Sequence, residues 1–178
     1  MNNMKTLIIV DAQNDFIAGS LPVPNAEKVV ENINAIIPKY DNVIFTMDWH
    51  PLNHCSFQRN GGEWPIHCLQ GSYGAAIRNS LIKTCIDNDI IYKICLKGTQ
   101  SEIEEYGAFG LDLVDEYDFM ESHGFCDWNN GIDLDDSYSY DICGFAGDYC
   151  VKATKENLEQ LGLNVNLIKD CTGYINYD

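Results

Sequence analysis

The fold class is decided by residues 140–161, which read YDICGFAGDYCVKATKENLEQL. The apolar run at 140–146 predicts a buried strand, and the apolar spacing of 151–161 predicts a helix. Cys150 lies at the junction, where the helix dipole and outward-pointing backbone N–H groups both favour a thiolate over a thiol. We therefore interpret Cys150 as a candidate nucleophile.

The same alternation of strand and helix continues along the chain on either side of this stretch. Apolar runs predict four more strands and helical spacing predicts two more helices; the strands are 7–10, 43–47, 90–96 and 164–168, and the helices are 25–37 and 77–86. Continuous apolar runs are typical of parallel strands that are covered on both faces. We expect an α/β fold, a three-layer α/β/α arrangement with a mainly parallel sheet, in one domain over residues 1–178.

The charge of the chain excludes some classes of partner. The formal net charge of −16 argues against nucleic acid and against an anionic membrane surface. Residues 101–141 hold thirteen Asp and Glu and no Lys or Arg, and we interpret this segment as a solvated acidic face. We find neither a signal peptide nor an apolar run long enough to cross a bilayer, so we expect a cytoplasmic protein. The eight cysteines form no CxxC pair, which indicates reduced thiols rather than a disulfide framework.

Four reactive residues follow predicted strands directly. Asp11, Asp48, Lys97 and Cys150 each lie at or just beyond the carboxyl end of a strand. In open parallel sheets, ligands bind in the crevice outside those ends. We therefore expect these four side chains to converge at one edge of the sheet.

Three of the four suit nucleophilic chemistry. Asp11 could accept the thiol proton of Cys150 and later deliver it to a leaving group, while Lys97 could stabilise the negative charge. Each residue also has an ordinary structural interpretation: the aspartate as a turn residue, the lysine as a solvated strand end and the cysteine as inert core. Their joint placement favours the catalytic interpretation.

A second cluster is typical of metal binding. Asp48 is followed by three of the four histidines, His50, His54 and His67. Histidine and carboxylate ligands suit Zn²⁺, Fe²⁺ or Mn²⁺. Surface histidines near a proline-rich turn are the alternative. For Glu63 we prefer a solvated loop position over a role as an additional ligand.

With these residues in view, the chain resembles the nicotinamidases of the isochorismatase-like cysteine hydrolase superfamily. The resemblance runs in order from about residue 4 to about residue 170. It is carried by five segments: VDAQNDF at 10–16, DWHPLNHCSF at 48–57, WPIHC at 64–68, LKGT at 96–99 and GFAGDYCV at 144–151. Each segment alone is weak, but the five in this order are specific.

The resemblance implies a role for each matching residue. The catalytic triad would be Asp11, Lys97 and Cys150, and a divalent metal would be held by Asp48, His50 and His67, with His54 as a further candidate. A cis peptide would precede Ala146, and the backbone N–H groups of Ala146 and Cys150 would form the oxyanion hole. Aromatic side chains that would line a pyridine pocket are Phe16, Trp64 and Tyr106.

Two places depart from the family pattern. Gly147 stands where the family more commonly carries a bulkier residue, which predicts a looser turn around the nucleophile. Residues 125–139 are unusually acidic and do not match the family's usual short helix and turn.

The resulting hypothesis is a metal-dependent amidohydrolase that converts nicotinamide to nicotinate and ammonia through a thioester on Cys150, a step of NAD salvage. The expected cofactor is one divalent ion, with Zn²⁺ favoured over Fe²⁺ and Mn²⁺, and the expected partner is the small-molecule substrate. Association into a homo-oligomer stays open. The alternatives are a metal-independent cysteine hydrolase of the same superfamily acting on another small amide, a non-catalytic binding protein, and a domain stabilised by structural zinc.

Overall fold

The computed structural model of the chain describes residues 4–110 and 134–176. Five strands form one sheet in the order β3-β2-β1-β4-β5, and every neighbouring pair is parallel. The strands are β1 Lys5–Val10, β2 Asn42–Asp48, β3 Ile91–Lys97, β4 Ser139–Gly144 and β5 Val165–Thr172. All five predicted strands are thus confirmed, although β5 runs further than the predicted 164–168.

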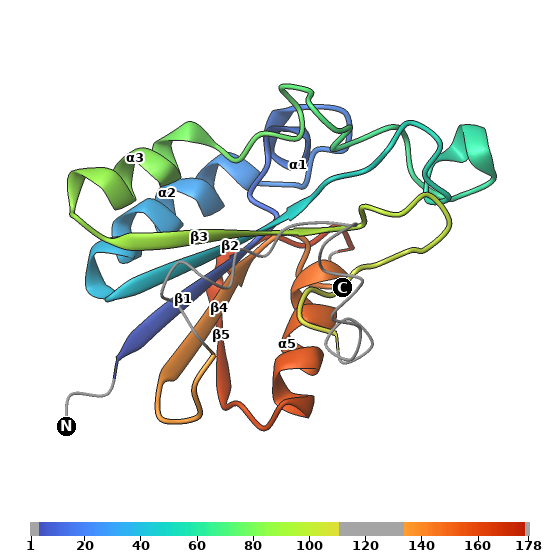
Figure 1. Ribbon diagram of the computed structural model, residues 1–178. Helices are drawn as coiled ribbons and strands as arrows, with labels where there is room; N and C mark the ends of the chain where they lie inside the picture. Colours follow the sequence, from blue (N-terminus) through green and yellow to red (C-terminus); the bar gives the residue numbers. More distant parts are fainter. Residues whose placement is uncertain (1–3, 111–133, 177–178) are drawn as a thin grey trace.

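Helices cover both faces of this sheet, which confirms the predicted three-layer arrangement (Figure 1). The α-helices are α1 Asn14–Ala18, α2 Ala26–Ile36, α3 Asn79–Asp87 and α5 Cys150–Gln160, and short 3₁₀ turns are η1 Ile37–Lys39 and η2 Gln58–Asn60. The predicted helices 25–37, 77–86 and 151–161 correspond to α2, α3 and α5. The sequence pattern missed α1, because five residues are too few for a helical repeat.

The two faces of the sheet carry separate hydrophobic cores. Along β1, Leu7 and Ile9 pack with α1, α2 and α3, whereas Ile8 and Val10 pack with α5 on the opposite face. All four side chains are fully buried. This is the period-two alternation of a strand covered on both sides, which makes the central strand apolar throughout.

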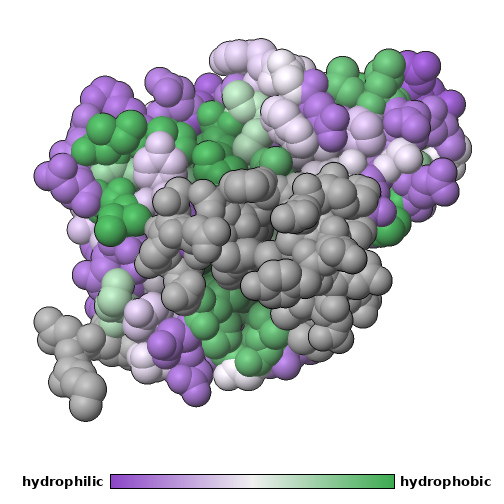
Figure 2. Space-filling view, viewed as in Figure 1, coloured by the Kyte–Doolittle hydropathy of each residue, from purple (hydrophilic) through white to green (hydrophobic). Residues whose placement is uncertain are grey.

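The two ends of the edge strand β3 differ in which side chains they expose. Ile91 begins β3 and is 60 % exposed, as is Ile86 at the end of α3. Figure 2 shows hydrophobic side chains gathered over this part of the surface, among mostly hydrophilic ones. Lys97, at the other end of β3, is only 2 % exposed. The buried charge therefore lies at the carboxyl end of the strand, and the exposed apolar side chains lie at its amino end.

Most of the acidic segment, residues 111–133, lies outside the described residues. In the parts of the chain that the structure describes, no helix combines the length and the apolar composition needed to cross a bilayer.

Candidate active site

The turn between β4 and α5 places Cys150 at the first position of the helix. The Phe145–Ala146 peptide bond is cis, as the family resemblance implies. Because the first N–H groups of a helix have no intrahelical acceptor, the Cys150 N–H is available to a ligand. Ala146 and Cys150 also line the same pocket. The geometry therefore allows both N–H groups that were expected to form an oxyanion hole to face one cavity.

The three predicted catalytic residues come together at the carboxyl edge of the sheet. Lys97 Nζ lies 2.9 Å from Asp11 Oδ2 and 3.5 Å from Cys150 Sγ. Sγ of Cys150 is also within 4.8 Å of a carboxylate oxygen of Asp11 and of Asp48. A proton on sulfur therefore has a carboxylate and an ammonium group as immediate neighbours.

Asp11 is fully buried at the end of β1, in a left-handed backbone conformation with φ of 47°. Burial raises the pKa of its carboxyl group to about 6, although the Lys97 ammonium opposes this shift. Thr46 Oγ donates a hydrogen bond of 2.6 Å to Asp11 Oδ1, which also favours the ionised form. Asp11 is therefore mostly a carboxylate at neutral pH, yet close enough to its pKa to exchange a proton.

The surroundings of Cys150 oppose the thiolate that the helix N-terminus favours. Burial raises the pKa of the thiol well above its usual value; Lys97 lowers it, but the carboxylates of Asp11 and Asp48 raise it further. A helix N-terminus contributes only about 0.3–1 kcal/mol at exposed sites, which is too little to reverse this balance. Cys150 is thus a thiol that needs a base when it reacts, and the nearest base is Asp11.

Asp48, His50 and His67 form a second group, in which one donor atom from each residue lies within 4.8 Å of the others. His50 Nε2 is 3.4 Å and His67 Nε2 is 4.0 Å from Asp48 Oδ2, and all three side chains are buried. Although burial alone would raise the pKa of Asp48, Lys97 and His50 hold it well below its usual range. An ionised carboxylate and two imidazoles are donors that suit a divalent transition metal.

A hydrogen bond at Nδ1 of His50 and of His67 determines which ring nitrogen of each histidine faces Asp48. His50 Nδ1 lies 2.8 Å from the Gly98 carbonyl oxygen, and His67 Nδ1 lies 2.8 Å from the Pro65 carbonyl oxygen. Because a carbonyl oxygen only accepts, each Nδ1 carries the proton and each Nε2 offers a lone pair in the neutral ring. Both lone pairs point to the side of Asp48, so these residues fit a bound metal ion.

Two neighbouring residues hold this arrangement in place. Gly98 has φ of +61°, and a Cβ atom there would lie 2.4 Å from the His50 ring, so only glycine allows this close approach. Gln13 accepts a hydrogen bond of 2.8 Å from the Asp48 N–H and donates one of 2.7 Å to the Asp48 carbonyl. The side chain of Gln13 therefore fixes the backbone of Asp48 from both sides.

The structure does not bring His54 into the metal group. Its ring stacks on His50, with centroids 4.0 Å apart, but both of its nitrogens have other partners. Nδ1 lies 2.7 Å from the Ser56 hydroxyl and also accepts the Ser56 N–H, while Nε2 lies 3.0 Å from the Ile103 carbonyl. Nε2 therefore carries the proton, and His54 offers no lone pair to a metal. Glu63 is exposed.

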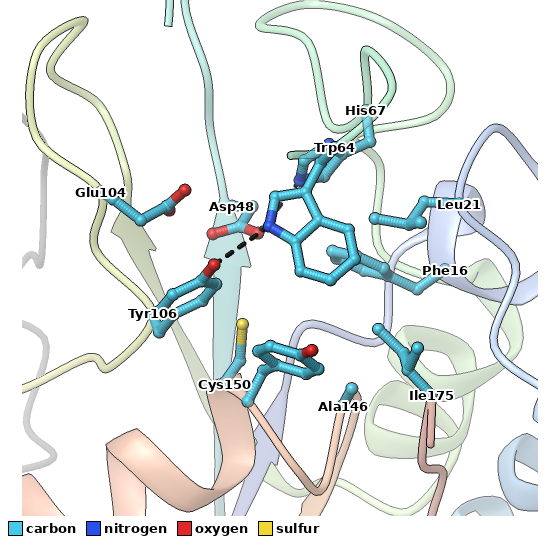
Figure 3. A pocket seen from close by; sticks show the side chains of 11 residues that line it. Phe16, Leu21, Asp48, Trp64, His67, Glu104, Tyr106, Ala146, Cys150 and Ile175 are labelled. Atoms are coloured by element: carbon cyan, nitrogen blue, oxygen red, sulfur yellow. Dashed lines mark hydrogen bonds and ion pairs between the residues drawn. The ribbon is translucent and has the colours of Figure 1, made fainter. Parts of the chain in front are cut away.

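A pocket opens between these two groups, and it includes all three aromatic residues predicted from the sequence: Phe16, Trp64 and Tyr106 (Figure 3). Trp64 Nε1 donates a hydrogen bond of 3.0 Å to the Tyr106 hydroxyl. Asp48 and His67 reach the pocket from the metal group, and Cys150 reaches it from the nucleophile turn. A flat ring between these walls would therefore have the thiol and the metal group within reach.

Sequence reasoning missed four lining residues, namely Leu21, Glu104, Tyr149 and Ile175. Only Tyr149 carried a local signal, since it precedes the nucleophile; its ring packs edge-on against Trp64 at a centroid distance of 5.1 Å. The other three reach the pocket through tertiary packing that no short motif encodes.

Comparison with known proteins places this geometry in a family. Residues 5–106 match the family model described as the isochorismatase domain, which covers more than half of the chain. The chain belongs to the isochorismatase-domain family. The resemblance to nicotinamidases within this family is also confirmed: the nicotinamidase of Saccharomyces cerevisiae is 31 % identical over 98 % of this chain and 90 % of that protein.

Solved structures of the isochorismatase-domain family have the same fold. The yeast nicotinamidase bound to the inhibitor nicotinaldehyde matches with a TM-score of 0.77 and 28 % identity, over 98 % of this chain and 90 % of that one. The pyrazinamidase of Pyrococcus horikoshii in complex with zinc has a TM-score of 0.71 and 32 % identity, over 97 % and 88 %. A protein from L. infantum in complex with nicotinate has a TM-score of 0.76 and 30 % identity, over 99 % and 84 %.

Proposed function

We propose that this protein hydrolyses nicotinamide to nicotinate and ammonia, through a thioester on Cys150. The observation that carries the proposal is one pocket in which an aromatic-walled space joins the Cys150 thiol to the Asp48–His67 side of the metal group. Nicotinamide is a flat ring with a carboxamide at one position and a nitrogen at another. The carboxamide can face the Cys150 thiol while the ring nitrogen faces the metal group. The relatives named as nicotinamidases support the same substrate.

In the first half of the reaction, Asp11 accepts the thiol proton of Cys150 while sulfur attacks the carboxamide carbon. The backbone N–H groups of Ala146 and Cys150 would stabilise the oxyanion that forms, and Lys97 would balance the charge of Asp11 and of the sulfur. The C–N bond then breaks, and Asp11 returns its proton to nitrogen so that ammonia leaves. The nicotinoyl group stays on Cys150 as a thioester.

In the second half, water attacks the thioester carbon and Asp11 accepts a proton from that water. The C–S bond breaks, and Asp11 returns its proton to sulfur to regenerate the thiol. The acid that leaves loses its remaining proton to solvent and becomes nicotinate. Asp11 thus acts twice as a base and twice as an acid, which suits a group whose pKa is raised to about 6.

Asp48, His50 and His67 would hold the divalent metal, and we propose Zn²⁺. A zinc-bound pyrazinamidase relative and the mixed carboxylate and imidazole donor set support this choice. When bound there, the metal supplies a Lewis acid that can bind a ring nitrogen and orient the substrate.

We also propose that one domain over the whole chain carries this activity, and that the protein works in the cytoplasm. Seven free cysteines among the described residues support a reducing compartment.

The test is ammonia release from nicotinamide by the purified protein loaded with Zn²⁺. We expect turnover that a chelator abolishes and that added Zn²⁺ restores. The Cys150→Ala variant is the control, since it should retain metal and lose all turnover. Absence of ammonia release from the metal-loaded wild-type protein would overturn the proposed function.

A further inference from the structure

The nucleophile turn also holds a segment from the far end of the described chain. Asp148, two residues before Cys150, accepts three hydrogen bonds from residues 175–176. Oδ1 accepts the Ile175 N–H at 3.0 Å, and Oδ2 accepts the Asn176 N–H at 2.8 Å and its side-chain amide at 3.0 Å. Hydrogen bonds to a carboxylate are among the stronger ones in proteins, so this contact ties residues 175–176 firmly to the turn.

A second contact beside it requires glycine at residue 147. Gly147 N donates to the Gly173 carbonyl at 2.7 Å, and the Tyr174 ring lies over Gly147. A Cβ atom at residue 147 would be 2.3 Å from the Tyr174 ring. The looser turn expected from Gly147 is therefore not observed, because residues 173–174 fill the space and brace the turn.

These contacts bring Ile175 into the wall of the pocket. Figure 3 shows its side chain next to Ala146, with Phe16 and Leu21 on the same side of the pocket and Glu104 and Tyr106 on the opposite side. One side of the pocket is thus aliphatic and aromatic carbon, and the other carries a carboxyl and a hydroxyl group. In Figure 3, Ile175 lies beside Ala146, whose backbone N–H would stabilise the oxyanion.

We propose that Ile175 is a specificity-determining residue of this pocket and that Asp148 is its positioning residue. This inference rests on the proposed function. Ile175 limits the width of the pocket on its apolar side, so that an unsubstituted pyridine carboxamide fits while a ring carrying a methyl group on that side is excluded. Asp148 contributes by fixing the backbone at Ile175, without touching the substrate.

The experiment compares kcat/KM for nicotinamide with kcat/KM for ring-methylated nicotinamides, one isomer for each free ring carbon. We define the ratio as kcat/KM for a methylated nicotinamide divided by kcat/KM for nicotinamide. For Ile175→Ala we expect this ratio to rise by about tenfold for at least one isomer, since one methyl group in a tight pocket changes kcat/KM by about 10–200-fold. Ile175→Phe should instead raise KM for nicotinamide. Ile168→Ala is the matched control: Ile168 lies in β5, is partly buried against the hydrophobic core and does not line the pocket, so the ratio should not change.

The role of Asp148 is tested by a double-mutant cycle. Asp148→Asn alone should raise the same ratio, because the amide cannot accept all three hydrogen bonds. In the Ile175→Ala background the same change should leave the ratio where it is, because the wall that Asp148 positions is already gone. A purely structural role for Asp148 would lower kcat for all substrates alike and leave the ratio unchanged in both backgrounds.

Unchanged ratios for every isomer in Ile175→Ala, with nicotinamide turnover intact, would overturn the inference and leave the proposed function standing. Absence of nicotinamide turnover in the wild-type protein would overturn both.

Discussion

Nζ of Lys97 lies 2.5 Å from Oδ1 of Asp48, so the group proposed for catalysis and the group proposed for metal binding share one buried cation. Lys97 is 2 % exposed, and its pKa is well above the usual value: burial would lower it, but the carboxylates of Asp11 and Asp48 raise it more. The ammonium group is therefore charged at every pH at which the protein would work. It links the two groups electrostatically.

Replacing Lys97 by methionine should therefore affect both groups. The change removes the charge and keeps most of the length of the side chain, which leaves two buried carboxylates without their shared partner. Removing one partner of a buried ion pair typically costs about 3–5 kcal/mol, so we expect a clear loss of unfolding free energy at neutral pH. Ammonia release should fall to background.

The stability loss caused by Lys97→Met should depend on pH. Because Lys97 lowers the pKa of Asp11, its removal raises that pKa, so Asp11 of the variant takes up a proton at a higher pH than Asp11 of the wild type, whose pKa is about 6. The stability difference between Lys97→Met and wild type should therefore shrink as the pH falls from the variant's Asp11 pKa towards 6. Urea unfolding of both proteins at several pH values measures it. A loss that is constant or grows toward acid would contradict the shared-cation arrangement.

The acid limb of the rate profile should report Asp11. Because its pKa is raised to about 6, kcat/KM for nicotinamide should fall as the pH drops through 6, when the base becomes protonated. Thr46→Val removes the hydroxyl that stabilises the carboxylate and keeps the shape of the side chain. We expect the limb to move to higher pH by about one unit, since a hydrogen bond to a charged group is worth about 1.5–3 kcal/mol. A limb that stays in place would remove Asp11 as the titrating base.

The three-residue metal site predicts a difference between two histidines. His67→Gln should lower the bound metal measured by elemental analysis, because it removes one of three donors. His54→Gln is the matched control, since both of its ring nitrogens are engaged by Ser56 and Ile103. Equal metal loss in the two variants would mean that His54 is a ligand after all.

Gln13 should influence metal affinity without being a donor. Its amide bonds both backbone groups of Asp48, and loss of such supporting contacts typically weakens metal binding about 10–100-fold. We expect a weakening in this range for Gln13→Ala in a competition titration with a chelator. Gln70→Ala is the control, because Gln70 bonds the Trp49 carbonyl from the exposed surface. Equal affinities in the two variants would contradict the supporting role.

The sequence predicts the position of a site residue well when that residue lies at the end of a strand. Asp11, Asp48 and Lys97 each end a strand or follow one directly, and parallel strands bring their carboxyl ends to one edge. A local apolar run followed by a polar residue is therefore enough to place them. The same reasoning places Cys150, because the strand-to-helix turn is continuous in sequence.

Prediction fails where a side chain's direction or environment depends on distant residues. His54 has the spacing of a metal ligand, but Ser56 and Ile103 determine where its nitrogens point. The helix N-terminus at Cys150 favours a thiolate locally, yet burial and two carboxylates from other strands outweigh it. Ile175 lines the pocket from a segment whose backbone is hydrogen-bonded to Asp148, and no local sequence pattern predicts that contact.

The packing of Tyr174 on Gly147 has a consequence for how the family can diverge. The two positions share one small volume, so a larger side chain at residue 147 is compatible only with a smaller or displaced one at residue 174. Substitutions at these positions should therefore be epistatic: a chain that acquires a bulky residue at 147 first would pass through a strained nucleophile turn, whereas one that loses the tyrosine first would not. In an alignment of relatives, residue size at the two positions should vary in opposite directions.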